Sequence, residues 1–276
     1  MNSEVDLKWT GERLVTSVDD ETATEHLHRY MLAMKYCQGL VVVDIACGEG
    51  YGSAFLASVA RSVIGVDIDS EAVKFASKKY KKSNLEYKVG TCSLIPVNSG
   101  SIDVLVSFET LEHHDQHVEM LLEVKRVLKP DGLLIMSSPD KTFYSDQRNF
   151  KNAFHVKELT NQQFEELIRS HFKSTNFANQ RMMYGSLIVP NLTEKSGPFE
   201  LYEGDYTYLR KKQFEPFYNI ALASDGTIPE MGSSFFNGDQ ILIDRMNSIY
   251  KSNSFRLGYH LLTPFRIVSR WLSFKK

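Results

Sequence analysis

The chain has little cysteine and no long apolar run. Only three cysteines, Cys37, Cys47 and Cys92, occur among 276 residues, and their spacing fits no metal-binding pattern. We therefore expect reduced, buried thiols, as in a cytoplasmic protein. No apolar stretch approaches the roughly 20 residues that a membrane-spanning helix needs. Residues 1–6 lack the basic and apolar regions of a signal peptide, so we expect a soluble protein that acts in the cytoplasm.

An excess of basic charge is also missing. The formal net charge is −2, and before Arg245 no basic face with interleaved aromatic residues is found. Nucleic acid is therefore not expected as a partner. The length and the hydrophobic fraction of 42% fit one sizeable core with additions.

Short apolar runs alternate with segments of helical periodicity through most of the chain. Expected strands lie at 41–45, 63–67, 85–89, 102–107, 133–138, Arg181–Val189 and Phe217–Ala223. Expected helices lie at 22–37, 51–60, 70–80, 116–128 and 161–172. This order predicts an α/β protein with a doubly wound, mostly parallel sheet that binds ligands at the carboxyl ends of its strands.

Two helices carry finer expectations. In helix 116–128 the apolar residues Val118, Leu121, Leu122 and Leu128 are expected to form the buried stripe. For helix 161–172, Thr160 and Gln163 have the spacing of a capping box.

The first strand leads into a glycine-rich turn. The run Val41–Ile45 contains Asp44, and Gly48, Gly50 and Gly52 follow before a helical segment. Glycines let the backbone approach a ligand where a Cβ would clash. A dinucleotide would place its pyrophosphate at this turn, beside the charges of Asp44 and Glu49. A cationic ligand suits those charges better, and S-adenosylmethionine carries a sulfonium and an ammonium, so the turn predicts a methyl-donor site.

A second acid supports this interpretation. The next β-branched run ends at Asp67, nineteen positions after Gly48, where a carboxylate would hold a ribose diol. Ile68 could then lie against the adenine. Alternatively, Asp67 could simply cap the helix that begins near Asp69 and Ser70.

Carboxylates and imidazoles follow the expected strand 102–107. Glu109, Glu112 and His113 are spaced i, i+3 and i+4, so on a helical turn they would share one face, and His155 follows the next strand. Together they could hold a divalent cation such as Mg²⁺ or Mn²⁺. His113 or His155 could instead act as a general base without metal, or these residues could be structural.

Four segments resemble class I S-adenosylmethionine-dependent methyltransferases. They are Val-Val-Asp-Ile-Ala-Cys-Gly-Glu-Gly-Tyr-Gly, Val-Ile-Gly-Val-Asp-Ile-Asp, Ser-Phe-Glu-Thr-Leu-Glu-His and Arg-Val-Leu-Lys-Pro-Asp-Gly. The resemblance covers residues 38–190 and implies a seven-stranded sheet with an antiparallel last strand, for which 217–223 is the candidate. It also implies the cofactor contacts: the methionine moiety borders Asp44, Ala46, Gly48 and Gly50, the ribose binds Asp67, and the sulfonium lies between Ser107 and Phe108.

One part of the family pattern is absent. The acid that normally follows the third strand and reads the adenine amino group is replaced within Gly90-Thr91-Cys92-Ser93. Thr91 or Cys92 would then contact the adenine through the backbone.

Two narrower resemblances concern the acceptor. The pattern Glu-x-x-Glu-His with a later histidine resembles the metal site of ubiquinone-pathway O-methyltransferases and of small-RNA-terminus 2′-O-methyltransferases. Thr-Gly-Glu-Arg13, Glu25-His-Leu-His-Arg-Tyr30, Ser-Phe-Glu-Thr-Leu-Glu-His-His and Asn-Ala-Phe-His-Val-Lys-Glu-Leu resemble bacterial methyltransferases of cell-surface polysaccharide synthesis, including O-antigen enzymes. The second resemblance spans residues 10–190 and implies that Arg13 and Tyr30 cover the cofactor.

The hypothesis is therefore an O-methyltransferase that modifies a sugar hydroxyl or sugar-linked phosphate of a bacterial surface glycan, or its nucleotide- or lipid-linked precursor. Glu109, His113 and His155 would align the acceptor. The alternatives are methylation of a quinone precursor or natural product, and a non-catalytic ligand-binding protein of the same fold.

The chain divides into three expected parts. Residues 1–37 would cover the cofactor, 38–224 would form the methyltransferase domain with an insertion at 190–216, and 225–276 would be an extension. From Arg245 onward there are seven basic residues and no acid, with apolar residues at helical spacing in 255–274. This tail could lie on an anionic inner-membrane surface, contact a glycosyltransferase, or pack on its own sheet.

Overall fold

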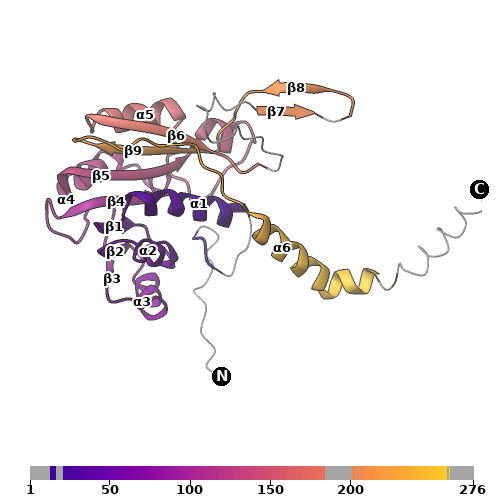
Figure 1. Ribbon diagram of the computed structural model, residues 1–276, viewed down its shortest axis with the longest axis horizontal. Coiled ribbons are helices and arrows are strands. Elements are labelled where there is room, and N and C mark those ends of the chain that lie inside the picture. Colours follow the sequence, from indigo (N-terminus) through magenta and orange to yellow (C-terminus); the bar gives the residue numbers. More distant parts are fainter. Residues whose placement is uncertain (1–12, 17–20, 184–200, 205, 260, 262–276) are drawn as a thin grey trace, which may run out of the picture.

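A twisted sheet of seven strands forms the body of the protein, with helices on both faces (Figure 1). The computed structural model describes residues 13–16, 21–183, 201–204, 206–259 and 261. The sheet contains β1 (Val41–Ile45), β2 (Ser62–Asp67), β3 (Leu85–Val89), β4 (Ile102–Phe108), β5 (Leu128–Pro139), β6 (Ser174–Gln180) and β9 (Tyr218–Ser224). The described helices are α1 (Glu21–Tyr36), α2 (Tyr51–Leu56), α3 (Ser70–Lys79), α4 (His117–Val127), α5 (Asn161–Arg169) and α6 (Asp239–Lys251).

The strand order is β3-β2-β1-β4-β5-β9-β6, and β9 runs antiparallel to both neighbours while the pairs among β1 to β5 are parallel. The expected doubly wound sheet with an antiparallel last strand is therefore confirmed. The chain reverses direction across the sheet between β1 and β4, which is where ligands bind in such folds.

Alternating side chains of the central strands are buried on opposite faces of the sheet. On β4, Val104 and Val106 pack with residues of α1 and α2, whereas Leu105 packs with residues of α4 and α5. Both faces of these strands are covered, which explains why their sequences are near-continuous apolar runs.

Helix α4 confirms only part of the expected stripe: Leu121 is buried, and so is Leu128, which begins β5. Its buried residues are His117, Met120, Leu121, Val124 and Val127. Val118 and Leu122 are exposed instead. The true stripe has regular helical spacing but begins with a histidine, whose Nε2 lies 2.9 Å from the main-chain oxygen of Leu111. Because this hydrogen bond satisfies its ring, His117 can be buried in the core, where an apolar residue is usual.

The strand expected at Arg181–Val189 was misplaced. The structure has strand β6 upstream, at Ser174–Gln180, and residues 181–183 lie outside any strand. Residues 184–189 lie outside the described residues. β6 pairs only with β9 at the sheet edge, and its half-buried, polar sequence Ser-Thr-Asn-Phe-Ala-Asn-Gln hides the strand from a hydrophobicity pattern.

The capping box is confirmed: the Thr160 side chain accepts a hydrogen bond from the Gln163 N–H, and the Gln163 side chain accepts one from the Thr160 N–H. Within the expected insertion, β7 (Leu201–Gly204) and β8 (Leu209–Lys212) form a separate hairpin. No helix among the described residues is both long and apolar enough to cross a bilayer. The three-part division of the chain stays a prediction.

Neighbouring leucines of α4 provide a direct test of its orientation. Leu121 is fully buried and Leu122 is 58% exposed. We expect Leu121→Ala to lower the free energy of unfolding by about 2–5 kcal/mol because it leaves a cavity, and Leu122→Ala to change it by less than about 0.5 kcal/mol. Urea unfolding of the two variants measures both values; equal losses would contradict the packing described.

Candidate functional site

The turn between β1 and α2 has a left-handed backbone. Ala46, Gly48 and Gly50 have φ angles of 56°, 55° and 92°. A Cβ on Gly50 would lie 2.7 Å from Ala76 and 2.8 Å from Tyr87, and one on Gly52 would overlap the Tyr30 ring. These two glycines are therefore required by the protein's own packing. At Gly48 the nearest neighbour is instead the flexible side chain of Arg13, whose Cγ would lie 3.3 Å from an added Cβ, so packing does not require glycine there.

The side chain of Asp44 lies buried beneath the turn. Its carboxylate is fully buried, accepts a 2.6 Å hydrogen bond from the Ser53 hydroxyl and lies 3.3 Å from the Tyr30 hydroxyl. Burial raises the pKa of Asp44 to about 7, although the bonds from Ser53 and Tyr30 act in the opposite direction. A nearby cation would favour the ionised form.

Contrary to the expectation from the sequence, Glu49 does not offer a negative charge to a cationic ligand. Its carboxylate is buried, and it accepts hydrogen bonds from the Thr16 N–H and hydroxyl and forms an ion pair with Lys79. The ammonium group of Lys79, the last residue of α3, neutralises the carboxylate charge of Glu49. The role of Glu49 is to fasten residues 13–16 over the glycine-rich turn.

Asp67 lies at the carboxyl end of β2, beside the same turn. One of its oxygens accepts a hydrogen bond from the Gly48 N–H at 2.8 Å, and the other accepts one from the Asp69 N–H at 2.9 Å. The cap of α3 is Asp69, which accepts from Glu71 N–H, so Asp67 is not needed as a cap. Ile68 is 73% exposed, and its contact with an adenine stays a prediction.

Arg13 and Tyr30 lie on opposite sides of this turn. The Arg13 guanidinium donates to Asp69 at 3.0 Å and lies 3.8 Å from Asp67. The Tyr30 ring packs edge-on against Phe108 at the end of β4, with centroids 5.1 Å apart. Both residues lie next to the turn, and their role in covering a cofactor stays a prediction.

The remaining expected cofactor residues have partners within the protein. The Ser107 hydroxyl is buried and donates to Thr110 at 3.1 Å. Thr91 forms an isolated bridge with Leu94, and Cys92 Sγ lies 3.3 Å from His114 Nε2. Contacts of these residues with a ligand stay a prediction.

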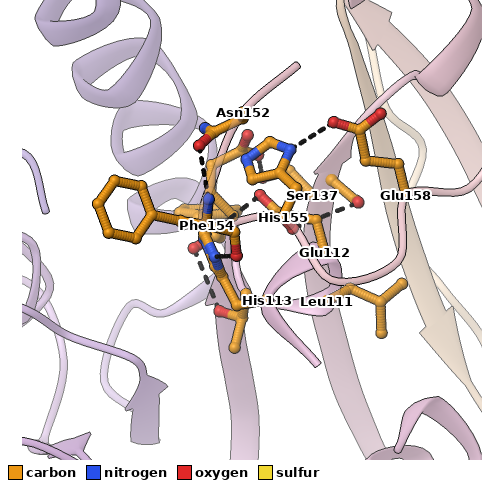
Figure 2. A network of polar contacts seen from close by, with 12 residues as sticks. Leu111, Glu112, His113, Ser137, Asn152, Phe154, His155 and Glu158 are labelled. Carbon is orange, nitrogen blue, oxygen red and sulfur yellow. Dashed lines mark hydrogen bonds and ion pairs between the residues drawn. The ribbon is translucent and has the colours of Figure 1, made fainter. Parts of the chain in front are cut away.

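Glu112, His113 and His155 come together beside the end of β4 (Figure 2). One ligating atom from each lies within 4.8 Å of the others. Glu112 is buried within the short helical turn Leu111–His113, and His155 belongs to the loop that precedes α5. The main-chain oxygen of Glu112 accepts hydrogen bonds from Val156 and Lys157 at 2.8 and 3.1 Å, which join that loop to the turn.

Each histidine of the cluster is oriented through its Nδ1. His155 Nδ1 bonds the Glu158 carboxylate, which also accepts from Ser145 at 2.7 Å, and His113 Nδ1 lies 3.2 Å from the Phe154 main-chain oxygen (Figure 2). Carboxylate and carbonyl partners of this kind place the ring proton on Nδ1 and turn Nε2 toward a ligand. The donor set and its supports fit a divalent cation.

Glu109 does not join the cluster, contrary to the expectation of a shared helical face. Its φ angle is 50°, and it precedes the turn that carries Glu112. Its carboxylate accepts a 2.6 Å hydrogen bond from Ser137 and lies 4.0 Å from Arg29. The left-handed backbone of Glu109 itself turns its side chain away from the cluster, so the i, i+3, i+4 spacing was misleading.

Two residues that hold side chains of the candidate site in place were not predicted from the sequence. Arg29 is fully buried between the Tyr218 ring and the Gln180 side chain, which accepts its hydrogen bond at 2.7 Å. Its charge faces Glu25 and Glu109. Glu158, three residues after His155, orients that ring. The spacing of Glu25 with Arg29 and of His155 with Glu158 was the available signal.

The sheet order and the turn at its point of reversal define a Rossmann-like methyltransferase fold. A methyltransferase from Archaeoglobus fulgidus has a similar structure, with a TM-score of 0.53 and 19% identity over 74% of this chain and 94% of that one. A putative methyltransferase from Bacillus halodurans also has a TM-score of 0.53, with 15% identity. Residues 43–136 match the family model described as a methyltransferase domain.

The chain is also similar to curated methyltransferases. A probable S-adenosylmethionine-dependent methyltransferase of Mycolicibacterium smegmatis is 32% identical over 59% of this chain and 64% of its own length. The mitochondrial ubiquinone biosynthesis O-methyltransferase of Schizosaccharomyces pombe is 26% identical over 63% of this chain and 65% of its own. The chain thus spans less than two thirds of the length of these relatives.

The pKa of Asp44 generates a prediction for binding of S-adenosylmethionine, the ligand expected from the sequence. Below pH 7 the carboxyl is protonated in the free protein, and a bound cation favours its ionised form, so binding should release a proton. We expect affinity to fall about tenfold from pH 7 to pH 5.5 as that proton must be displaced. Calorimetry at pH 6 in two buffers of different ionisation enthalpy counts the protons.

Asp44→Asn provides the control for this measurement, because it has no proton to release. The ligand's own amino group, with an ordinary pKa near 7.7–8.0, is already protonated at pH 6. If the native chain releases no more protons than the variant, Asp44 does not face the cationic part of the ligand.

Proposed function

We propose that this protein is an S-adenosylmethionine-dependent O-methyltransferase. The observation that carries the proposal is the cluster of Glu112, His113 and His155 at the end of β4, on the same sheet edge as Asp44 and Asp67. A donor held at the first two strands and an acceptor held at the fourth would meet at the point where the sheet reverses.

Most of the rate enhancement in this proposal comes from alignment. The sulfonium already activates the methyl group, so the protein must hold the acceptor oxygen in line with it and exclude competing water. The rings of Tyr30 and Phe108, which pack edge-on at 5.1 Å, would exclude water next to Asp44, whose carboxylate lies 3.3 Å from the Tyr30 hydroxyl.

A hydroxyl acceptor must also lose its proton as it is methylated. His113 or His155, each oriented through Nδ1, would accept that proton at Nε2. The same three side chains would hold Mg²⁺ or Mn²⁺, with the remaining coordination positions left for the acceptor. Such an ion would supply a lowered pKa for the bound hydroxyl.

For the acceptor we propose a sugar hydroxyl or sugar-linked phosphate of a bacterial surface glycan, or of its nucleotide- or lipid-linked precursor. The motifs of residues 10–190 that resemble polysaccharide-modifying methyltransferases support this choice. We place the reaction in the cytoplasm, at the inner membrane surface where such precursors are assembled.

A second candidate acceptor is a quinone precursor or related small molecule. It is favoured by the similarity to the yeast ubiquinone-pathway enzyme over 63% of this chain, together with the carboxylate and histidine cluster. A non-catalytic ligand-binding role is the remaining alternative.

Binding and product analysis test the proposed activity. We expect the purified chain to bind S-adenosylmethionine in calorimetry, and Asp67→Ala to weaken this by about tenfold or more through loss of the ribose contacts. Glycans from a strain with the gene should be about fourteen daltons heavier per modified site than glycans from a deletion strain. No binding would exclude the enzyme, and unchanged glycans with methylated quinones would favour the second acceptor.

His155 provides the test of the cluster. We expect His155→Ala to lower the methylation rate about 10²–10⁴-fold, whether the ring is a base or a ligand. His171→Ala, after the far end of α5, should leave the rate unchanged. An unaltered rate in His155→Ala would return that residue to a structural role.

Metal dependence separates the two roles of the cluster. If it holds a cation, EDTA should abolish activity, Mn²⁺ should restore it, and Mn²⁺ should give a bound electron paramagnetic resonance signal that Glu112→Gln removes. Full activity in EDTA would leave the histidine base as the mechanism.

A further inference from the structure

Helix α6 extends away from the sheet (Figure 1). None of its residues is buried, and residues 253–259 and 261, which are again helical, are exposed or half-buried. An ion pair joins Arg245, at the middle of α6, to Glu21 of α1 at 4.0 Å. Earlier in the extension, Ile228 and Met231 pack against the core, but α6 buries no residue on the sheet. Most of the apolar segment 255–274, for which such packing was one of the expectations, lies outside the described residues.

One side of α6 is apolar along its length. At helical spacing Leu242, Ile243, Met246, Ile249 and Tyr250 fall on one face, and their exposed fractions range from 38% to 51%. Asn247, Ser248 and Lys251 lie on the other side. Water-facing stripes of this size are unusual in proteins that bind nothing there.

Charge is distributed unevenly along the same segment. Asp239 and Asp244 lie in the half of α6 nearest the body, and from Arg245 to the end of the sequence there are seven basic residues and no acid. Residues 1–244 hold 25 basic and 34 acidic residues, a formal charge of −9. The distal part of the extension thus complements an anionic surface that the body would avoid.

The aromatic residues of the segment favour a lipid surface over a protein groove. Tyr250, Phe255 and Tyr259 are exposed next to Lys251 and Arg256. Aromatic rings with basic neighbours are typical of helices that lie at the level of lipid headgroups.

We propose that α6 and the basic residues after it bind the surface of an anionic phospholipid bilayer, with the apolar face of α6 inserted between the headgroups. The basic side chains of the extension contact lipid phosphates, and the acidic body remains in water. This inference uses only the extension, so it is independent of the proposed reaction.

Vesicle sedimentation of the full chain tests the proposal. We expect it to sediment with vesicles of phosphatidylcholine and phosphatidylglycerol at 3:1, and about tenfold less with phosphatidylcholine alone. Raising NaCl from 0.1 to 0.5 M should also weaken sedimentation, because the Debye length shortens. Equal sedimentation with both lipids, or none with either, would overturn the proposal.

Two double variants locate the contact. Met246→Asp with Ile249→Asp places two charges on the apolar face and should reduce vesicle binding about tenfold or more. Asn247→Asp with Ser248→Asp adds the same charge to the polar face of the same helix and should reduce it much less. Similar losses in both would mean that charge alone acts and the apolar face is not inserted.

Sedimentation velocity without lipid examines a second copy of the chain as the alternative occupant. A monomer in both variants and in the native chain supports the bilayer. A dimer that dissociates only in the Met246→Asp and Ile249→Asp variant would overturn the proposal. Unchanged S-adenosylmethionine binding or unfolding transitions in both variants would show that the body is intact.

Discussion

The parallel pairing of β1 with both β2 and β4 is the constraint on which the candidate site depends. Ile45 lies opposite Val66 on one side and Ser107 on the other. This register brings the ends of three strands to one edge and places Asp44, Asp67 and Phe108 near each other, although they are far apart in sequence. Apolar side chains on both faces of the sheet fix the register, because a slip by one residue would exchange the two faces. The positions of the site residues therefore follow from core packing.

The central strands and the acidic positions could be predicted from the sequence because they depend on short-range patterns. β1 and β3 have the expected bounds, and Asp67 lies beside the turn as its spacing indicated. Glu49 could not be assigned in the same way. Its role depends on Lys79 and Thr16, and nothing local to the turn shows that they neutralise and anchor it.

The errors have a common physical origin, which is that a pattern was interpreted without its tertiary partner. Glu109 has the right spacing for the cluster, but its own left-handed backbone turns its side chain toward Ser137 and Arg29. His117 occupies a core position only because main-chain oxygens satisfy its ring. β6 is polar because it forms the edge of the sheet. Helix α6 was not expected at all, although its apolar residues have helical spacing.

Glu112 connects the fold to the chemistry more directly than any other residue. Its main chain holds the loop that carries His155, and its buried carboxylate lies 3.9 Å from His113 Nε2. The Ser138 hydroxyl lies 3.4 Å from the same carboxylate. Either a divalent ion or a proton on an adjacent imidazole would balance this charge. In the proposed reaction both solutions would use the same three side chains, and the metal-bound and metal-free mechanisms would differ in which cation accompanies Glu112 when the acceptor binds.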